Sequence, residues 1–69
     1  MDQKQLTNIY SYLIGKRWQP ANRLCKSMGL WMRVAIKDGE HIPLDSSYKE
    51  HRLNVEMKDG IVIAVLSIG

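Results

Sequence analysis

The last third of the chain constrains the fold most strongly, because it predicts two strands joined by a tight turn. Arg52 to Met57 alternates apolar and polar residues, with Leu53, Val55 and Met57 on one side. That period of two is typical of a half-buried strand. Lys58-Asp59-Gly60 is a turn signal, and residues 61–66 form an apolar run of strand length. We therefore expect a hairpin over residues 52–66.

Two helices are expected before this hairpin. Residues 4–14 carry apolar side chains at helical spacing and are followed by Gly15 as a stop: Leu6, Ile9, Tyr10, Leu13 and Ile14. Residues 19–28 have Pro20 in the first turn and Gly29 just past the end. One face of this second helix should hold Ala21, Leu24, Cys25 and Met28.

A further strand and a long loop complete the predicted order. Residues 31–37 alternate again, with Met32, Val34 and Ile36 on one face. Residues 38–51 are polar and contain Gly39 and Pro43, which predicts a long loop. The expected fold is α+β: one or two N-terminal helices packed on a small three-stranded mixed sheet, with a long exposed loop between the first two strands.

Length and composition limit the range of functions. The 69 residues, of which 45% are hydrophobic and 25% charged, suit one soluble domain over residues 1–69. A cleft large enough for a cofactor would consume much of so small a core. The polar start, the lack of an apolar run of about 20 residues and the single cysteine, Cys25, favour a cytoplasmic protein without membrane contact. Cys25 is expected to be a small core residue.

The charge is unevenly distributed, which raises the possibility of nucleic-acid binding. Residues 1–37 carry +6 and residues 38–69 carry −3. The candidate contacts are basic residues with two tryptophans as stacking platforms: Lys16, Arg17, Arg23, Lys26, Arg33, Trp18 and Trp31. A solvated helical face explains the same pattern without any ligand, and we expect that explanation to hold.

Potential catalytic residues crowd one loop and do not predict an enzyme. His41, Asp45, Ser46, Ser47 and His51 include the side chains of a hydrolase triad. A triad, however, needs a rigid scaffold and an oxyanion hole. Neither histidine lies at a zinc-ligand spacing from Cys25, and the glycines fall at element ends. We expect no catalytic residue, no metal and no cofactor.

The loop itself is the most informative feature, since a structureless segment this long is unusual in a small domain. Ile42-Pro43-Leu44 lies at its centre. Pro43 fixes its own φ and biases Ile42 toward an extended conformation. An extended backbone presenting one large side chain, here Leu44, is what a serine protease accepts in its cleft.

The order of these parts resembles the potato inhibitor I type of serine protease inhibitor, eglins included. The likeness covers residues 13–69 and is strongest to small bacterial members. It rests on the following segments: Leu13-Ile14-Gly15-Lys16, Arg52-Leu53-Asn54-Val55-Glu56, Asp59-Gly60, residues 61–66 and Gly69. Ile42-Pro43-Leu44-Asp45 is similar to the family's Val-Thr-Leu-Asp segment.

The resemblance implies a protease-facing loop over residues 39–52, with Leu44-Asp45 as the reactive bond. The reactive segment would be Ile42, Pro43, Leu44, Asp45 and Ser46. Arg52 and Asn54 match the positions whose side chains brace the loop from the next strand. Pro43 stands where the family has threonine, and Ser46-Ser47 lengthens the stretch before Arg52, which would loosen it. The implied partner is a subtilisin-like or chymotrypsin-like serine protease.

The same fold also suits a non-inhibitory module that binds another cytoplasmic protein through the loop or an exposed strand face. Nucleic-acid binding through the basic half is the weaker alternative. The chain is expected to be a monomer, or a homodimer if an edge strand pairs with a second copy.

Overall fold

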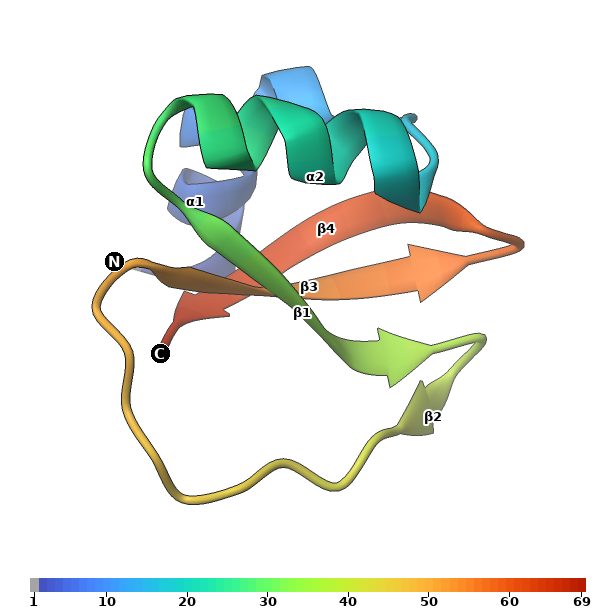
Figure 1. Cartoon of the computed structure of the whole chain (residues 1–69). Coiled ribbons are helices and arrows are strands. Elements are labelled where there is room, and N and C mark those ends of the chain that lie inside the picture. Colours follow the sequence, from blue (N-terminus) through green and yellow to red (C-terminus); the bar gives the residue numbers. More distant parts are fainter. Residues whose placement is uncertain (1) are drawn as a thin grey trace.

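The computed structural model describes residues 2–69, so Met1 of the expected domain lies outside the described residues. The chain forms two α-helices, one 3₁₀ turn and four strands (Figure 1), which confirms the expected α+β class. In order the elements are α1 (Gln3–Ile9), η1 (Ser11–Leu13), α2 (Trp18–Ser27), β1 (Trp31–Lys37), β2 (Glu40–His41), β3 (Arg52–Lys58) and β4 (Ile61–Ile68). Within the described residues, no helix is long and apolar enough to cross a membrane.

The sheet has four strands in the order β2-β1-β3-β4, one more than the sequence predicted. β1 and β3 are parallel, whereas β3–β4 and β1–β2 are antiparallel. The additional strand follows Asp38-Gly39, whose φ angles of 51° and 81° form a two-residue turn between Lys37 and Glu40. Aspartate-glycine with both φ positive is a favoured hairpin connection. The predicted loop over 38–51 is therefore too long: residues 38–39 form a turn, residues 40–41 form β2, and the loop itself spans residues 42–51 between β2 and β3.

The expected C-terminal hairpin is confirmed, and its turn is built in the same way. Asp59 and Gly60 have φ angles of 53° and 77° between paired Lys58 and Ile61. The two turns lie side by side at the same end of the sheet, and the Asp59 N–H donates to the Asp38 carboxylate at 2.8 Å. β4 continues to Ile68, two residues beyond the predicted end.

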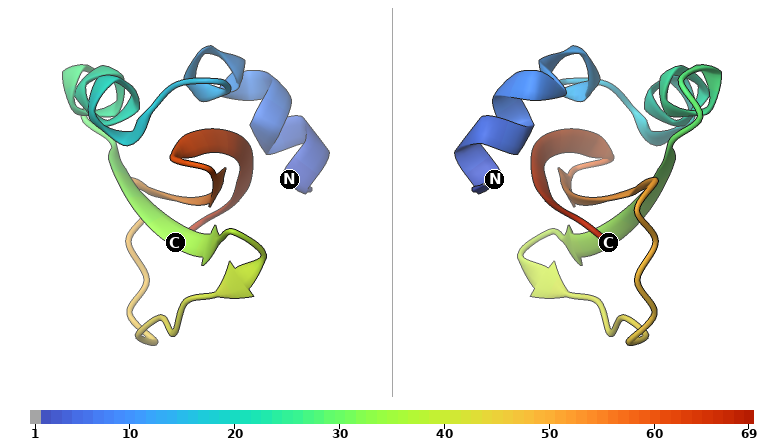
Figure 2. Two further views of the ribbon diagram at one scale, coloured as in Figure 1. Left: turned by 90° about the vertical axis from the view of Figure 1, so that its right-hand side faces the viewer. Right: turned by 90° about the vertical axis from the view of Figure 1, so that its left-hand side faces the viewer.

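The helices cover one face of the sheet, and the core lies between them (Figures 1 and 2). The alternation along β3 is confirmed, since Leu53, Val55 and Met57 are all buried in this core. The other fully buried core residues are Leu13, Ala21, Cys25, Val62 and Val65.

Several expected core positions lie outside the core, for one reason in the helices and another in β1. Ile9, Leu24 and Met28 are exposed, since α1 ends at Ile9 and only the Ala21–Cys25 side of α2 meets the sheet. In β1 the register with β3 shifts between Val34 and Ile36, so Ile36 leaves the core face. A bulge of this kind reverses the side-chain alternation beyond it.

The helix ends follow local capping chemistry. Asp2 and Gln5 form a capping box, in which the Asp2 carboxylate accepts from the Gln5 N–H at 2.9 Å. The predicted helix over 4–14 breaks after Ile9 and resumes only as the η1 turn. The second helix ends at Ser27, and the Leu30 N–H donates to the Cys25 carbonyl across Gly29 at 2.8 Å.

The outer edge of β4 is occupied by earlier parts of the chain. The Thr7 hydroxyl accepts from the Val65 N–H at 3.1 Å and donates to the Val65 carbonyl at 3.2 Å. Val62 exchanges two backbone bonds with Gly15 and Lys16. These contacts cover backbone groups that would otherwise be free to pair with another strand.

Candidate functional site

The segment between β2 and β3 runs on the side of the sheet away from the helices (Figures 1 and 2). Because side chains alternate along a strand, the core residues of β3 face the helices and Arg52 and Asn54 face this segment. The alternation that builds the core therefore also directs polar side chains at the loop.

A tight turn at Asp45 to Ser47 forms the centre of the site. The Asp45 carboxylate accepts from the Ser47 hydroxyl at 2.6 Å and from the Ser47 N–H at 3.2 Å. These two bonds, assisted by Arg52 and Arg33, hold the pKa of Asp45 below its ordinary value although the side chain is largely exposed. Such side-chain-to-backbone bonding is typical of aspartate in turns.

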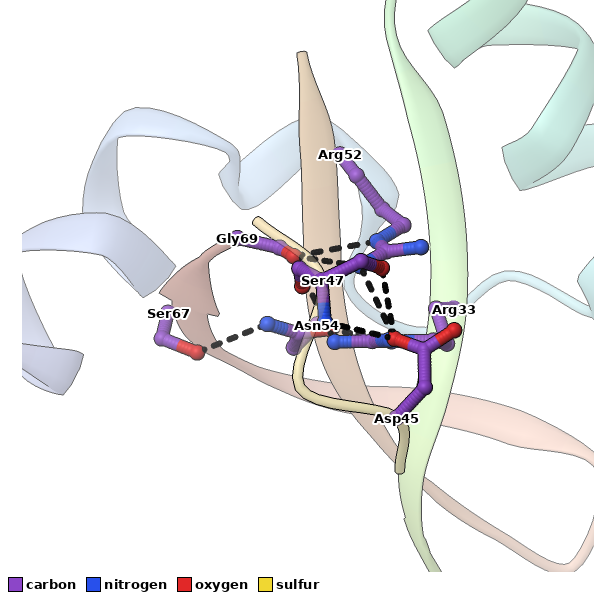
Figure 3. A network of polar contacts seen from close by, with 7 residues as sticks. All are labelled: Arg33, Asp45, Ser47, Arg52, Asn54, Ser67 and Gly69. Carbon is purple, nitrogen blue, oxygen red and sulfur yellow. Dashed lines mark hydrogen bonds and ion pairs between the residues drawn. The ribbon is translucent and has the colours of Figure 1, made fainter. Parts of the chain in front are cut away.

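Arg33, from β1, holds this turn to the sheet (Figure 3). Its guanidinium donates to the Asp45 carboxylate at 3.2 Å, to the Asn54 side-chain oxygen at 2.8 Å and to the Gly69 carbonyl at 3.3 Å. The Arg33 side chain is only 21% exposed, so much of this network is shielded from water. A planar fork with several donors suits such a branched set of acceptors.

Arg52, the first residue of β3, holds the next part of the loop. Its Nη2 donates to the Ser47 carbonyl at 3.0 Å and to the Gly69 carbonyl at 2.7 Å, and Nε donates to Gly69 at 3.0 Å. The same guanidinium lies 3.8 Å from the Asp45 carboxylate. The Gly69 N–H in turn donates to the Arg52 carbonyl at 2.9 Å. The end of the described chain is therefore part of the support.

Asn54 has a different role from the one its sequence position implied. It is 6% exposed and makes no described contact with the loop. Its oxygen accepts from Arg33, and its amide nitrogen donates to the Ser67 hydroxyl at 3.0 Å (Figure 3). Asn54 thus orients Arg33, which in turn contacts Asp45.

Arg33 is the residue of this site that sequence reasoning missed, since it was considered only for nucleic-acid contact. Arg33 and Asn54 are register partners in the parallel β1–β3 pair. The register of two strands separated by a long loop is not visible in the sequence. The alternation alone could have placed Arg33 on the face opposite the core.

The segment before the turn is anchored at one end and exposed at the other. Ile42 is half-buried, and its N–H donates to the Ala35 carbonyl at 2.9 Å. Pro43, Leu44 and Ser46 are exposed, and Leu44 retains 42% of its surface. A partner that pairs with the Ile42 N–H would first have to break the bond to Ala35. Leu44 therefore lies between two held points, Ile42 and Asp45.

The side chains that suggested other chemistry are placed apart or are engaged elsewhere. Ser47 donates to Asp45 rather than to a histidine, and His51 lies 3.3 Å from Glu50. Among residues 2–69, no three histidine, cysteine or acidic side chains lie together as a metal site. Burial raises the pKa of the Cys25 thiol, which makes it a poor nucleophile.

The basic set proposed for nucleic acid is also divided. Arg33 points into the loop network, and Trp18 packs against the core, whereas Trp31 is 70% exposed. Lys16, Arg17, Arg23 and Lys26 remain exposed. Arg33 and Trp18 therefore do not extend a binding surface over the helices.

Comparisons with protein-family models, curated proteins and solved structures find no match. The function is therefore inferred from the geometry of this site.

Proposed function

We propose that the protein is a serine protease inhibitor whose substrate-like loop, expected over residues 39–52, is the segment 42–51 between β2 and β3, with Leu44-Asp45 as the reactive bond. One observation carries the proposal: an exposed Leu44 directly precedes a turn that two arginines hold to the sheet. Leu44 would fill the primary pocket of a chymotrypsin-like or subtilisin-like enzyme. As a hot spot seated in that pocket, Leu44 would supply a large share of the affinity, and truncating it would cost about 2–4 kcal/mol.

A loop already held in place loses little conformational entropy on binding. Ser47, which lengthens the loop, supports this because it bonds to Asp45 and Arg52 instead of loosening the segment. Pro43 adds stiffness by fixing φ next to Leu44.

Resistance to turnover follows from anchors on both sides of the reactive bond. Cleavage would leave Leu44 as a new carboxyl end, two residues after the Ile42 N–H that is bonded to Ala35. It would leave Asp45 as the new amino end, and the side-chain carboxylate of Asp45 would keep its bonds from Arg33 and Ser47. Two ends held close together favour religation over release, since the effective concentration of the amine stays high.

The proposed compartment is the cytoplasm. The one cysteine, Cys25, is buried as a free thiol, and the absence of a disulfide framework in so small a domain suits a reducing environment.

The test is titration of subtilisin and of chymotrypsin with the purified protein, followed by residual activity and mass spectrometry. The proposal expects stoichiometric loss of activity with the chain intact or cut slowly at Leu44-Asp45. Rapid cutting at that bond with full protease activity would refute inhibition and favour the module that binds another protein through its loop.

A change at Leu44 tests the assigned pocket residue. Leu44→Lys should transfer inhibition from chymotrypsin to trypsin, because the primary pocket of trypsin accepts a basic side chain. Leu24→Lys is the matched control, since Leu24 is 37% exposed on α2, away from the loop. If both variants inhibit chymotrypsin equally well, Leu44 is not the anchor.

A further inference from the structure

Two exposed aromatic side chains flank a hollow beside the loop. Trp31 and Tyr48 retain 70% and 71% of their surface, the largest values among the exposed large hydrophobic residues. They share a hollow of about 450 Å³, whose other lining residues are Lys49, Glu50, His51 and Arg52. Aromatic residues are enriched at protein interfaces, and an exposed pair is costly unless a partner covers it.

The walls of this hollow are fixed by the same contacts that hold the loop. Tyr48 follows Ser47, whose carbonyl is bound by Arg52, and the Tyr48 ring passes close to Gly69. The Trp31 N–H donates to the His51 carbonyl at 2.8 Å, where β1 and β3 begin to pair. The backbone beneath both walls therefore belongs to the framework and loses little freedom when the hollow is covered.

Tyr48, one wall of the hollow, lies close enough to Leu44 in the chain to fall within an interface of ordinary size. A protease–inhibitor interface buries roughly 800 Å² on each partner, which corresponds to a disc of about 16 Å radius. Tyr48 is four residues after Leu44, so a fully extended chain would separate them by at most about 14 Å. An interface of this size centred on Leu44 is therefore wide enough to reach the Tyr48 wall of the hollow.

The charge around the hollow favours an acidic neighbour. Lys49 and Arg52 bring two positive charges to the lining, whereas Glu50, which lies 3.3 Å from His51, brings one negative charge. Within residues 2–69, Lys49 has no side-chain hydrogen bond or ion pair and stands as a basic group at the rim.

We propose that the Trp31–Tyr48 hollow is a second contact site for the target protease. It would receive an apolar side chain, with a carboxylate beside it, from the enzyme surface next to the cleft that binds the residues after Asp45. This inference rests on the proposed inhibitory function and adds a specificity element that the loop apex does not supply.

The test compares inhibition constants of Trp31→Ala and Tyr48→Ala with that of the wild type, using whichever of subtilisin and chymotrypsin the wild type inhibits. Each should weaken inhibition at least 10-fold, as expected for an aromatic anchor. Tyr12→Ala, at an exposed tyrosine on η1, is the matched control and should change it less than 3-fold. Unfolding midpoints near that of the wild type would show that all three variants are folded.

A charge reversal gives an independent readout. Lys49→Glu should slow association at low salt, and the difference should shrink as salt screens it. If the wild type inhibits but both aromatic variants match it within 3-fold, this inference is wrong and the inhibitory function stands. If the wild type inhibits neither enzyme, the proposed function fails and this inference fails with it.

Discussion

Removing the Arg33 guanidinium is the most informative test of how the loop is held to the sheet. Arg33→Met keeps most of the aliphatic stem but deletes the guanidinium donors that Arg33 supplies to Asn54, Asp45 and Gly69. Gly69 keeps its bonds from Arg52. The Asn54 oxygen, in a residue only 6% exposed, loses the partner that the structure gives it.

The expected cost is that of one orphaned buried acceptor, about 1–3 kcal/mol in the free energy of unfolding. The contact with the exposed Asp45 carboxylate is not counted, because water screens it. A domain of this length is stable by only about 3–10 kcal/mol, so the loss should be plainly visible. Arg23→Met, at an exposed position of α2, should change stability by less than about 0.5 kcal/mol.

Urea unfolding followed by circular dichroism measures these free energies. The comparison holds if the m-value, the slope of the unfolding free energy against urea concentration, is the same in each variant as in the wild type. A double variant separates the orphaned acceptor from other effects. Asn54→Leu added to Arg33→Met removes the unpaired oxygen, and the exposed Ser67 hydroxyl that it leaves can bond to water. The pair should therefore recover part of the loss. Equal stabilities for Arg33→Met and Arg23→Met would refute the reasoning.

Three further changes test other parts of the structure. Thr7→Val removes both hydroxyl bonds to Val65, so it should cost about 1–3 kcal/mol and promote self-association detectable by analytical ultracentrifugation, whereas Thr7→Ser should not. Ser47→Ala should raise the pKa of Asp45 toward its ordinary value in an NMR titration of the carboxyl carbon. The pKa of Asp45 is lower in the folded than in the unfolded protein, so the ionised carboxylate stabilises the fold above about pH 4, and this stabilisation is lost as pH falls through the folded pKa. Ser47→Ala should therefore make the free energy of unfolding less dependent on pH in the acid range. Gly60→Ala should cost about 1–2 kcal/mol in urea unfolding purely through its φ of +77°, since no atom lies within 4 Å of the added Cβ; an unchanged midpoint would contradict this.

The parts of the fold that the sequence predicted are those encoded by local patterns. Leu53, Val55 and Met57 are buried as the alternation requires, and Asp59-Gly60 forms the expected turn. Asp38-Gly39 carries the same turn signal, and it was missed because the polar residues after it favoured a continuous loop.

The remaining differences depend on packing between distant segments. The bulge between Val34 and Ile36 adjusts β1 to β3, and the sequence of β1 alone does not show it. The exposure of Leu24 depends on how α2 is rotated on the sheet. The support of Asp45 combines Arg33, Asn54 and Gly69 from three strand regions, so it follows from strand register rather than from any local pattern.

The central claim is that the sheet holds the backbone around Leu44 rigid while its side chain remains exposed. Backbone ¹⁵N relaxation of the free protein measures this directly through the order parameters of Leu44, Asp45, Ser46 and Ser47. The account predicts values near those of the strands, about 0.8 or higher. Values below about 0.6 would show a flexible loop that a protease cuts, and they would contradict the account.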